Sequence, residues 1–288
     1  MSLALKIPKI RASGIWKKSR LPLVIGGSLT SVMVALGIVS IFWVPRDVNG
    51  IDPAFRMLSI GTPHHLFGTD YLGRDVTSML MAGLRTSIII GSSAAFLSLV
   101  IGTILGMVAS SVSKLDEPIM RMADIFMAMP GIIFALVLAS TIGPGYLTTI
   151  FALTSFFTPA FVRVTRASSM RVLAEDYIAV ARLYGRKRLF ITFRHVLPNI
   201  SSILIVQFTI YFAAGVLSEA GLSYLGVGIN RPSVSLGMML HEAVEQIGIS
   251  DPLCVWPGLA IVILVIGLNL LGDGLRDHFD PRFSQRVR

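Results

Sequence analysis

The sequence predicts an all-α polytopic membrane protein with six transmembrane helices. Of its 288 residues, 53% are hydrophobic and only 14% are charged, and its mean hydropathy of +0.75 is outside the range of soluble domains. Crossing a hydrocarbon core of about 30 Å takes roughly 20 apolar residues. The apolar stretches that meet or approach this length are Leu21–Val44, Ile88–Val112, Met122–Ile142, Leu147–Val164, Pro198–Gly221 and Val255–Leu275.

The distribution of basic residues predicts the orientation of these spans. Twenty of the 25 Lys and Arg residues fall on the side that carries both termini, so we expect both termini in the cytoplasm. Residues 1–20 then form a cytoplasmic basic arm, 45–86 an external segment and 276–288 a cytoplasmic tail. The net charge of +9 reflects this topology and predicts the lipid bilayer as a partner, with anionic lipid facing the basic side. No basic and aromatic face indicates nucleic-acid binding.

The first span, residues 21–44, is long enough to cross the bilayer and is followed by no small-residue cleavage site, so we expect a retained helix. Cys254, at the membrane boundary just before the sixth span, is the single cysteine. An internal disulfide and a cysteine metal site are therefore excluded.

The third and fourth spans contain residues that break or start helices. Asp116, Glu117 and Pro118 predict a helix start before span three. Pro130-Gly131 should weaken or bend that span, Gly143-Pro144-Gly145 should form a tight external turn, and Pro159 makes the short fourth span the weakest.

Asp124 lies at the membrane edge of span three. An acid in that place is a candidate for the transport path or its gate, although Arg121 is three residues away and could pair with it. We expect pairing to be its main role.

The loop between spans four and five, residues 165–197, predicts a short amphipathic helix outside the bilayer. Its apolar stripe consists of Leu173, Tyr177, Val180, Ala181 and Tyr184. Gly185 ends this pattern where a left-handed residue would close a helix, and basic residues follow it.

The next apolar helix should start at Pro198, with Leu197 extended before it. Small side chains at Ala179 and Ala181 allow close approach of another surface. Because isolated helices under about 12–15 residues are marginal in water, the short helix should need a protein groove. The alternative is a basic loop that only fixes the orientation of the chain.

This loop resembles the coupling loop of ABC importer permeases. Their signature is Glu-Ala-Ala, three residues, Gly, nine residues, Ile, one residue and Leu-Pro. The residues of this chain that occupy the signature are Ala179, Val180, Ala181, Gly185, His195, Leu197 and Pro198, with Tyr177 just before it. The ending Arg194-His195-Val196-Leu197-Pro198-Asn199 resembles the dipeptide, oligopeptide and nickel branch, and the chain resembles the second permease subunit of such systems.

Three further phrases resemble the same branch: residues 64–76, 219–228 and 272–282. In the first, Gly68 and Gly73 permit tight turns, while Asp70 and Asp75 can cap backbone donors or pair with Arg74. We expect a rigid, self-satisfied loop there, with direct substrate contact as the alternative. His64 and His65 are too few ligands for a nickel or zinc site.

The second phrase begins at Glu219, at the external end of span five. A carboxylate facing lipid would be costly, so Glu219 should face the transport path or form a capped structural acid. His241-Glu242 lacks the second histidine of a zinc-protease motif and predicts a polar external helix.

No P-loop and no nucleophile elbow occurs in the sequence, so we expect no enzymatic chemistry and no cofactor in this chain. The resemblance implies the type I ABC importer permease fold, with residues 87–275 as its core. It also implies as partners a homologous permease, two cytoplasmic ATPases that bind ATP and Mg, and an external solute-binding protein. The implied function is peptide import across the cytoplasmic membrane of a bacterium.

The sequence is also compatible with other functions. The same architecture could import nickel or a metal chelate. A membrane scaffold or sensor subunit that binds an ATPase, and a self-contained channel or secondary carrier, are alternatives of other classes.

Overall fold

The computed structural model describes residues 13–246 and 252–279. The described residues form helices joined by short connections, with no strand among them beyond two isolated bridges. The helices are α1 (Ser13–Phe42), η1 (Pro53–Phe55), α2 (Val76–Ser111), α3 (Ser113–Ala128), α4 (Gly131–Ile142), α5 (Tyr146–Leu173), α6 (Asp176–Leu183), α7 (Arg188–Ile191), η2 (Thr192–Val196), α8 (Leu197–Tyr224), α9 (Leu236–Val244) and α10 (Pro252–Phe279).

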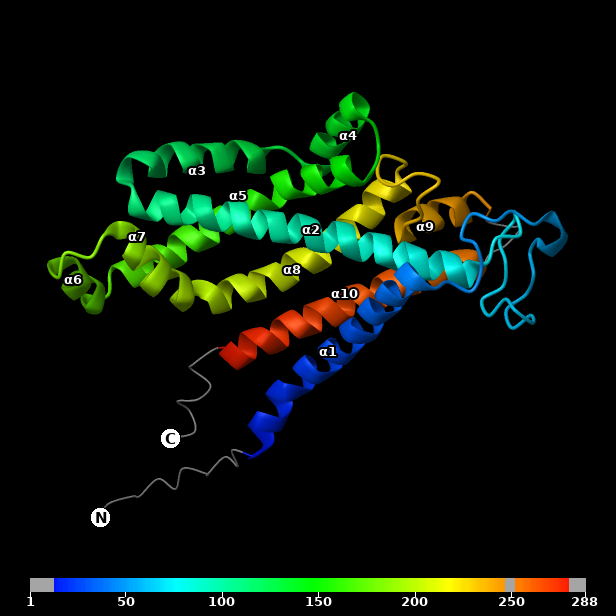
Figure 1. Ribbon diagram of the computed structural model, residues 1–288, viewed down its shortest axis with the longest axis horizontal. Helices are drawn as coiled ribbons and strands as arrows, with labels where there is room; N and C mark the ends of the chain where they lie inside the picture. Colours follow the sequence, from blue (N-terminus) through cyan, green and yellow to red (C-terminus); the bar gives the residue numbers. More distant parts are fainter. Residues whose placement is uncertain (1–12, 247–251, 280–288) are drawn as a thin grey trace, which may run out of the picture.

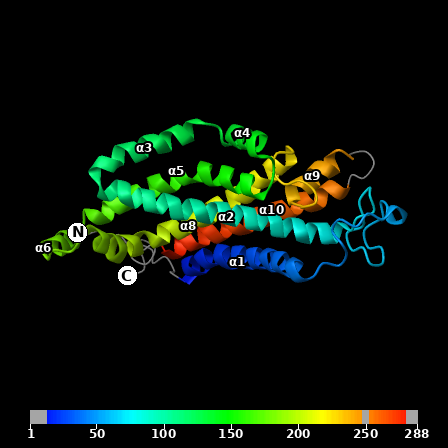
Figure 2. The same cartoon turned by 45° about the horizontal axis from the view of Figure 1, so that its top comes forward.

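Five helices are long and apolar enough to cross a membrane, or six spans are present if the bent pair α3–α4 counts as one. This agrees with the predicted all-α, six-span class. The long helices run side by side, with α6 at one end of the molecule and residues 45–75 with α9 at the other (Figures 1 and 2). The first described turn of α1 and the last turn of α10 lie towards the same end as α6 (Figure 1).

The predicted third span, Met122–Ile142, is not one continuous helix. The chain forms α3 and α4, whose axes differ by 86° across the break at Met129 and Pro130. Met129 and Pro130 both have extended backbones, with ψ of 130° and 124°, and proline has no N–H to continue the helical ladder. The predicted bend at Pro130-Gly131 is therefore confirmed, but it is sharp enough to divide the span.

The long helices extend beyond the predicted spans. Helix α2 begins at Val76, inside the predicted external segment, because Asp75 caps its first turn by accepting from the Ser78 N–H at 2.8 Å. Helix α5 passes through Pro159 and continues to Leu173. Span five was predicted to start at Pro198, and α8 begins at Leu197 with Pro198 in its first turn. Helix α7 and η2 precede it without a break, so the whole helical stretch runs from Arg188 to Tyr224.

Helix α2 is the centre of the bundle, since it packs against α1, α5, α8, α3 and α9. Its closest contact is with α5, where a Cβ at Gly106 would lie 2.6 Å from Thr165 Cβ and 2.7 Å from the Val162 carbonyl oxygen. Small residues allow this approach between membrane helices. The α2–α5 pair therefore forms a tightly packed frame, and α1, α3, α4, α8 and α9 pack against it.

Candidate functional site

The short helix predicted in the loop after span four is present as α6. Ile178 is its buried anchor, with 0% exposure, and it packs in one apolar cluster with Ile191, Val196, Ile200 and Leu204 from α7, η2 and α8. Leu173 and Ala181 pack partly against the same cluster. Helix α6 is thus seated on the N-terminal end of the α7–α8 stretch, as a marginal helix requires.

The predicted apolar stripe is divided between two faces. Tyr177 and Val180 are 43% and 50% exposed, and Tyr184 is 83% exposed, so these members point away from the chain. Leu183, which was absent from the predicted stripe, is 87% exposed beside them. We define Tyr177, Val180, Leu183 and Tyr184 as the outer face of α6.

Gly185 closes α6 as predicted. Its φ is +74°, its N–H donates to the Arg182 carbonyl at 2.9 Å, and the Arg186 N–H donates to the Ala181 carbonyl at 3.2 Å. These two bonds form a Schellman motif, whose left-handed residue is favoured as glycine. The Arg186 guanidinium then lies over the Phe190 ring, 4.8 Å from its centroid, which turns the chain towards α7.

Tyr177 and His195 of the predicted coupling set lie together, with ring centroids 5.9 Å apart. The Asn199 amide joins them, because its Nδ2 donates to the His195 carbonyl at 2.7 Å and to the Tyr177 hydroxyl at 3.4 Å. Ala179 is exposed, and Pro198 occupies the first turn of α8.

The prediction that Leu197 is extended before Pro198 is wrong. Leu197 is helical, with φ −55° and ψ −46°, and its N–H donates to the Thr192 carbonyl in a π-type bond. The five-residue π-helical segment Thr192–Val196 joins α7 to α8 at the point where Pro198 lacks a donor. The chain therefore continues as a helix instead of turning.

Glu219 is buried between α8, α2 and α9, with 0% exposure. Its carboxylate accepts from Ser87 Oγ of α2 at 2.6 Å and from Ser223 Oγ at 2.7 Å. The Ser223 hydroxyl also accepts from the Ile229 N–H at 3.0 Å, which fixes the turn after α8. Within the single chain Glu219 is a capped acid, and its predicted place at the transport path stays a prediction.

Asp124 is paired, but the expected partner was wrong. Arg121 pairs with Glu117 one helical turn before it, and Asp124 accepts from Arg163 Nη2 of α5 at 2.5 Å. The side chains of Asp124 and Arg163 are 58% and 44% exposed. Asp124 and Arg163 are far apart in sequence and are brought together by the packing of α3 on α5. The spacing of residues along the sequence therefore could not indicate this pair.

The segment 45–75, predicted to be external, is tied to α9 by charged side chains. Arg74 donates from Nε to Asp70 and from Nη2 to Glu242 at 2.8 Å, and Arg231 donates to the same Glu242 oxygen at 2.7 Å. Burial of Glu242 opposes its ionisation, but the hydrogen bond and charge of Arg231 and the charge of Arg74 outweigh it, so the pKa of Glu242 lies below its ordinary value. Burial lowers the pKa of Arg74, but the charges and hydrogen bonds of Asp70 and Glu242 outweigh this effect, so the pKa of Arg74 lies above its ordinary value.

The predicted tight turns and internal hydrogen bonds of this loop are confirmed. Gly68 and Gly73 have φ of +77° and +82°, and Asp70 and Asp75 accept backbone N–H groups. His65 is buried with Nδ1 3.0 Å from Asp75 Oδ1. Among the residues whose placement the structure describes, no group of three or more His, Cys, Asp or Glu side chains could hold a metal ion.

Comparison with known proteins places this geometry in context. A family model described as binding-protein-dependent transport system inner membrane component matches residues 98–285. The di/tripeptide transport system permease protein DppC of Pseudomonas aeruginosa is 37% identical over 269 residues, covering 90% of this chain and 88% of that protein. A putative peptide transport system permease protein of Brucella suis is 39% identical over 90% of this chain and 87% of its own length.

A glutathione transport system permease protein, GsiD of Pectobacterium atrosepticum, is 33% identical over 91% of this chain and 87% of its own length. Among solved structures, the inward-facing MetNI methionine ABC transporter is similar, with a TM-score of 0.57 and 20% identity over 73% of this chain and 96% of that chain. At that identity the likeness shows a shared fold.

Proposed function

Because this chain belongs to the family of binding-protein-dependent transport system inner membrane components, we propose that it is one of two permease subunits of an ATP-driven bacterial importer of short peptides. Family membership makes the chain a multi-pass membrane permease. The names of the similar permeases, which refer to di- and tripeptides, peptides and glutathione, support a peptide substrate.

The observation that carries the proposal is the construction of α6. One side is anchored inside the chain by Ile178, while Tyr177, Val180, Leu183 and Tyr184 form an apolar outer face whose side chains are 43–87% exposed. An exposed apolar face on a surface helix is typical of a helix that fits a partner's groove. A cytoplasmic ATPase is the partner that this proposal assigns to the outer face.

The complex then contains this chain, a homologous permease, two ATPases and an external solute-binding protein. ATP and Mg bind to the ATPases, and this chain needs no cofactor and performs no enzymatic reaction. The common end shared by α6, the start of α1 and the end of α10 supports an orientation with both termini in the cytoplasm and the segment 45–75 outside (Figure 1).

In the proposed mechanism, closure of the ATPases moves α6, and the movement passes through its seat on α7 and η2 into α8. The helices then alternate between inward-open and outward-open arrangements. Glu219 contributes by holding α2, α8 and the start of α9 together near the external end of the path, and Asp124 holds α3 to α5 at the other end.

The test is purification of the chain from its native membranes in mild detergent, followed by mass spectrometry and by peptide flux in reconstituted vesicles. We expect a homologous permease, ATPases and a solute-binding protein to co-purify, and flux to need ATP. Flux without ATP, or a homo-oligomer from a preparation in which a control complex survives, would favour a carrier or channel. Complete assembly without flux of any peptide would favour the scaffold or another solute.

A further inference from the structure

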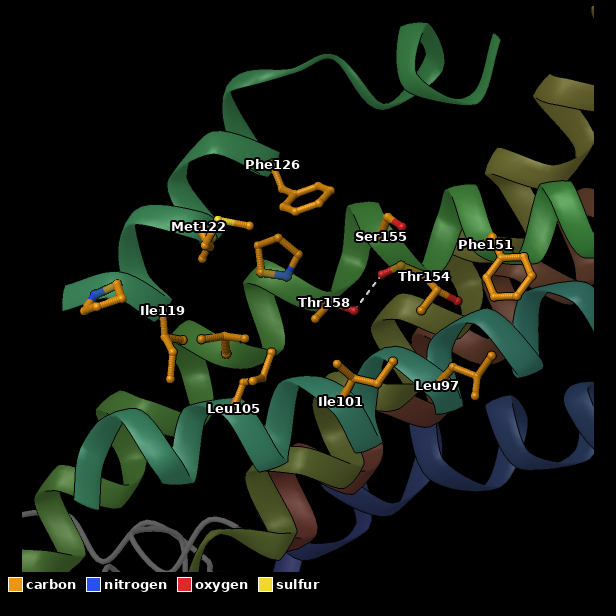
Figure 3. A pocket seen from close by; sticks show the side chains of 14 residues that line it. Leu97, Ile101, Leu105, Ile119, Met122, Phe126, Phe151, Thr154, Ser155 and Thr158 are labelled. Carbon is orange, nitrogen blue, oxygen red and sulfur yellow. Dashed lines mark hydrogen bonds between the residues drawn. The ribbon is translucent and has the colours of Figure 1, made fainter. Parts of the chain in front are cut away.

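An apolar groove lies between α3 and the α2–α5 frame (Figure 3). Its volume is about 550 Å³, and its walls include Ile101 and Leu105 of α2, Met122 and Phe126 of α3, and Phe151 and Val162 of α5. No charged side chain lines it. Its hydroxyls come from Thr154, Ser155 and Thr158 of α5, and Thr158 Oγ1 donates within its own helix to the Thr154 carbonyl at 2.7 Å.

The groove is elongated, and a pair of opposite charges borders it. Along α5 its lining runs from Phe151 to Val162, a length of about 16 Å at 1.5 Å per residue. The next residue is Arg163, which donates to Asp124 of α3 at 2.5 Å. Both side chains of this pair are about half exposed, so each has room for a further partner.

This arrangement restricts the chemistry of an occupant. A peptide buried in the groove would leave backbone N–H and C=O groups without hydrogen-bond partners, which is unfavourable away from water. A hydrocarbon chain needs no such partner. Exposed apolar side chains of Leu97, Ile101, Phe151 and Met122 also border the groove, so it is continuous with a surface suited to the bilayer interior.

We propose that the groove holds one acyl chain of an aminophospholipid, whose phosphate lies at Arg163 and whose ammonium group lies at Asp124. An arginine and a carboxylate side by side match the two charges of such a headgroup, and arginine is well suited to phosphate oxygens. This site goes beyond the importer function, which specifies no lipid. It also gives Asp124 a place at the membrane surface, as an alternative to the transport path.

The experiment purifies the transporter through a tag on this chain and measures retained phospholipids by native mass spectrometry and lipid extraction. Ser155→Phe fills the groove, and Ser28→Phe makes the same change at an exposed position of α1. We expect Ser155→Phe to lose one tightly held phospholipid per copy of the chain, while Ser28→Phe retains it.

A second pair of variants tests the headgroup. In lipid mixtures of phosphatidylethanolamine and phosphatidylglycerol, Arg163→Gln should lower the retained phospholipid severalfold, and Arg163→Lys, which keeps the positive charge, should restore most of it. Asp124→Asn should abolish the preference for phosphatidylethanolamine over phosphatidylglycerol. These readouts concern retained lipid, so they do not depend on the solute or on transport.

Three results would overturn the lipid site. The first is the same retained phospholipid in Ser155→Phe and in the unmodified chain. The second is loss of a sister permease from Ser155→Phe but not from Ser28→Phe, which would show that a partner's helix fills the groove. The third is altered peptide uptake with unchanged lipid in Asp124→Asn, which would place Asp124 in the transport path. If Ser155→Phe fails to accumulate, the Arg163 and Asp124 variants decide the question.

Discussion

Arg74 and Glu242 are separated by 168 residues in the sequence and are joined by a hydrogen bond of 2.8 Å between Nη2 and Oε2. Their side chains are only 5% and 16% exposed, and Arg231 shares the Glu242 carboxylate. The segment 45–75 before α2 is thereby fastened to α9.

Removing the shared carboxylate should destabilise this connection. Glu242→Ala leaves two arginines without their common partner, and breaking a buried ion pair in this way costs about 3–5 kcal/mol. Because Arg74 keeps Asp70, we expect a value near the lower limit. Thermal unfolding of the purified protein in detergent measures it. Glu117→Ala is the control, because that carboxylate pairs with Arg121 at the surface and should cost less than about 1 kcal/mol.

The same carboxylate predicts a dependence on pH. The pKa of Glu242 is lowered in the folded chain, so its contribution to stability is present above the unfolded pKa of about 4.3 and is lost as pH falls through the folded pKa. Hydrogen-exchange protection of α9, measured relative to the intrinsic exchange rate at each pH, should therefore decrease as pH falls through the lowered pKa of Glu242. An identical acid profile in Glu242→Gln, which cannot titrate at this position, would assign the effect to other groups.

Gly185→Val should reduce transport without removing the protein from the membrane. A Cβ at this glycine meets no atom within 4 Å, so the effect comes from a β-branched residue forced to φ +74°. Strain of this kind costs about 1–3 kcal/mol and would displace the end of α6. Gly185→Asn is the matched control, because asparagine tolerates left-handed backbones. Normal uptake by Gly185→Val at normal abundance would contradict a coupling role.

The two faces of α6 should respond differently to substitution. Leu183→Ser changes an 87% exposed side chain, so the subunit should keep its stability while co-purifying ATPase falls severalfold. Ile178→Ala removes the buried anchor and should cost about 2–5 kcal/mol of subunit stability. Quantitative mass spectrometry of ATPase recovered per permease distinguishes them. Full ATPase recovery with Leu183→Ser would exclude a major contact at that position.

Gly106→Leu should prevent stable packing of α2 on α5. The added side chain would collide with Thr165 and with the Val162 backbone, and overpacking of this size typically costs 1–3 kcal/mol or more. Gly258→Leu in α10 is the control, since a Cβ there meets nothing within 4 Å. Membrane abundance and protease resistance of the two variants measure the difference.

Much of this architecture could be predicted from local sequence. Apolar stretches predicted the spans because the bilayer demands continuous apolar length. Gly185 predicted the end of α6, since few other residues take a left-handed conformation, and Pro130 predicted the bend between α3 and α4. In each case the residues that determine the feature lie at it or within a few positions of it in the sequence.

The predictions that were wrong or missing concern features that depend on contacts beyond the neighbouring residues in the sequence. Arg163 was not predicted as the partner of Asp124, because only the packing of α3 on α5 brings the two together. Ile178 was not predicted as the anchor of α6, because both Ile178 and its neighbour Tyr177 are apolar and only the facing cluster decides which is buried. The rule that a residue before proline is extended failed at Leu197, where the π-type bond to Thr192 keeps the chain helical.

The stretch from Arg188 to Tyr224 is helical throughout and contains one π-helical segment. It carries the seat of α6 around Ile200 and, about 28 Å further along at 1.5 Å per residue, the buried carboxylate of Glu219. The π-helical segment Thr192–Val196 interrupts the α-helical hydrogen bonding near the start of this stretch. Because Ile178 of α6 packs directly on Ile200 and Leu204 of α8, a displacement of α6 would act on the same helix that carries Glu219.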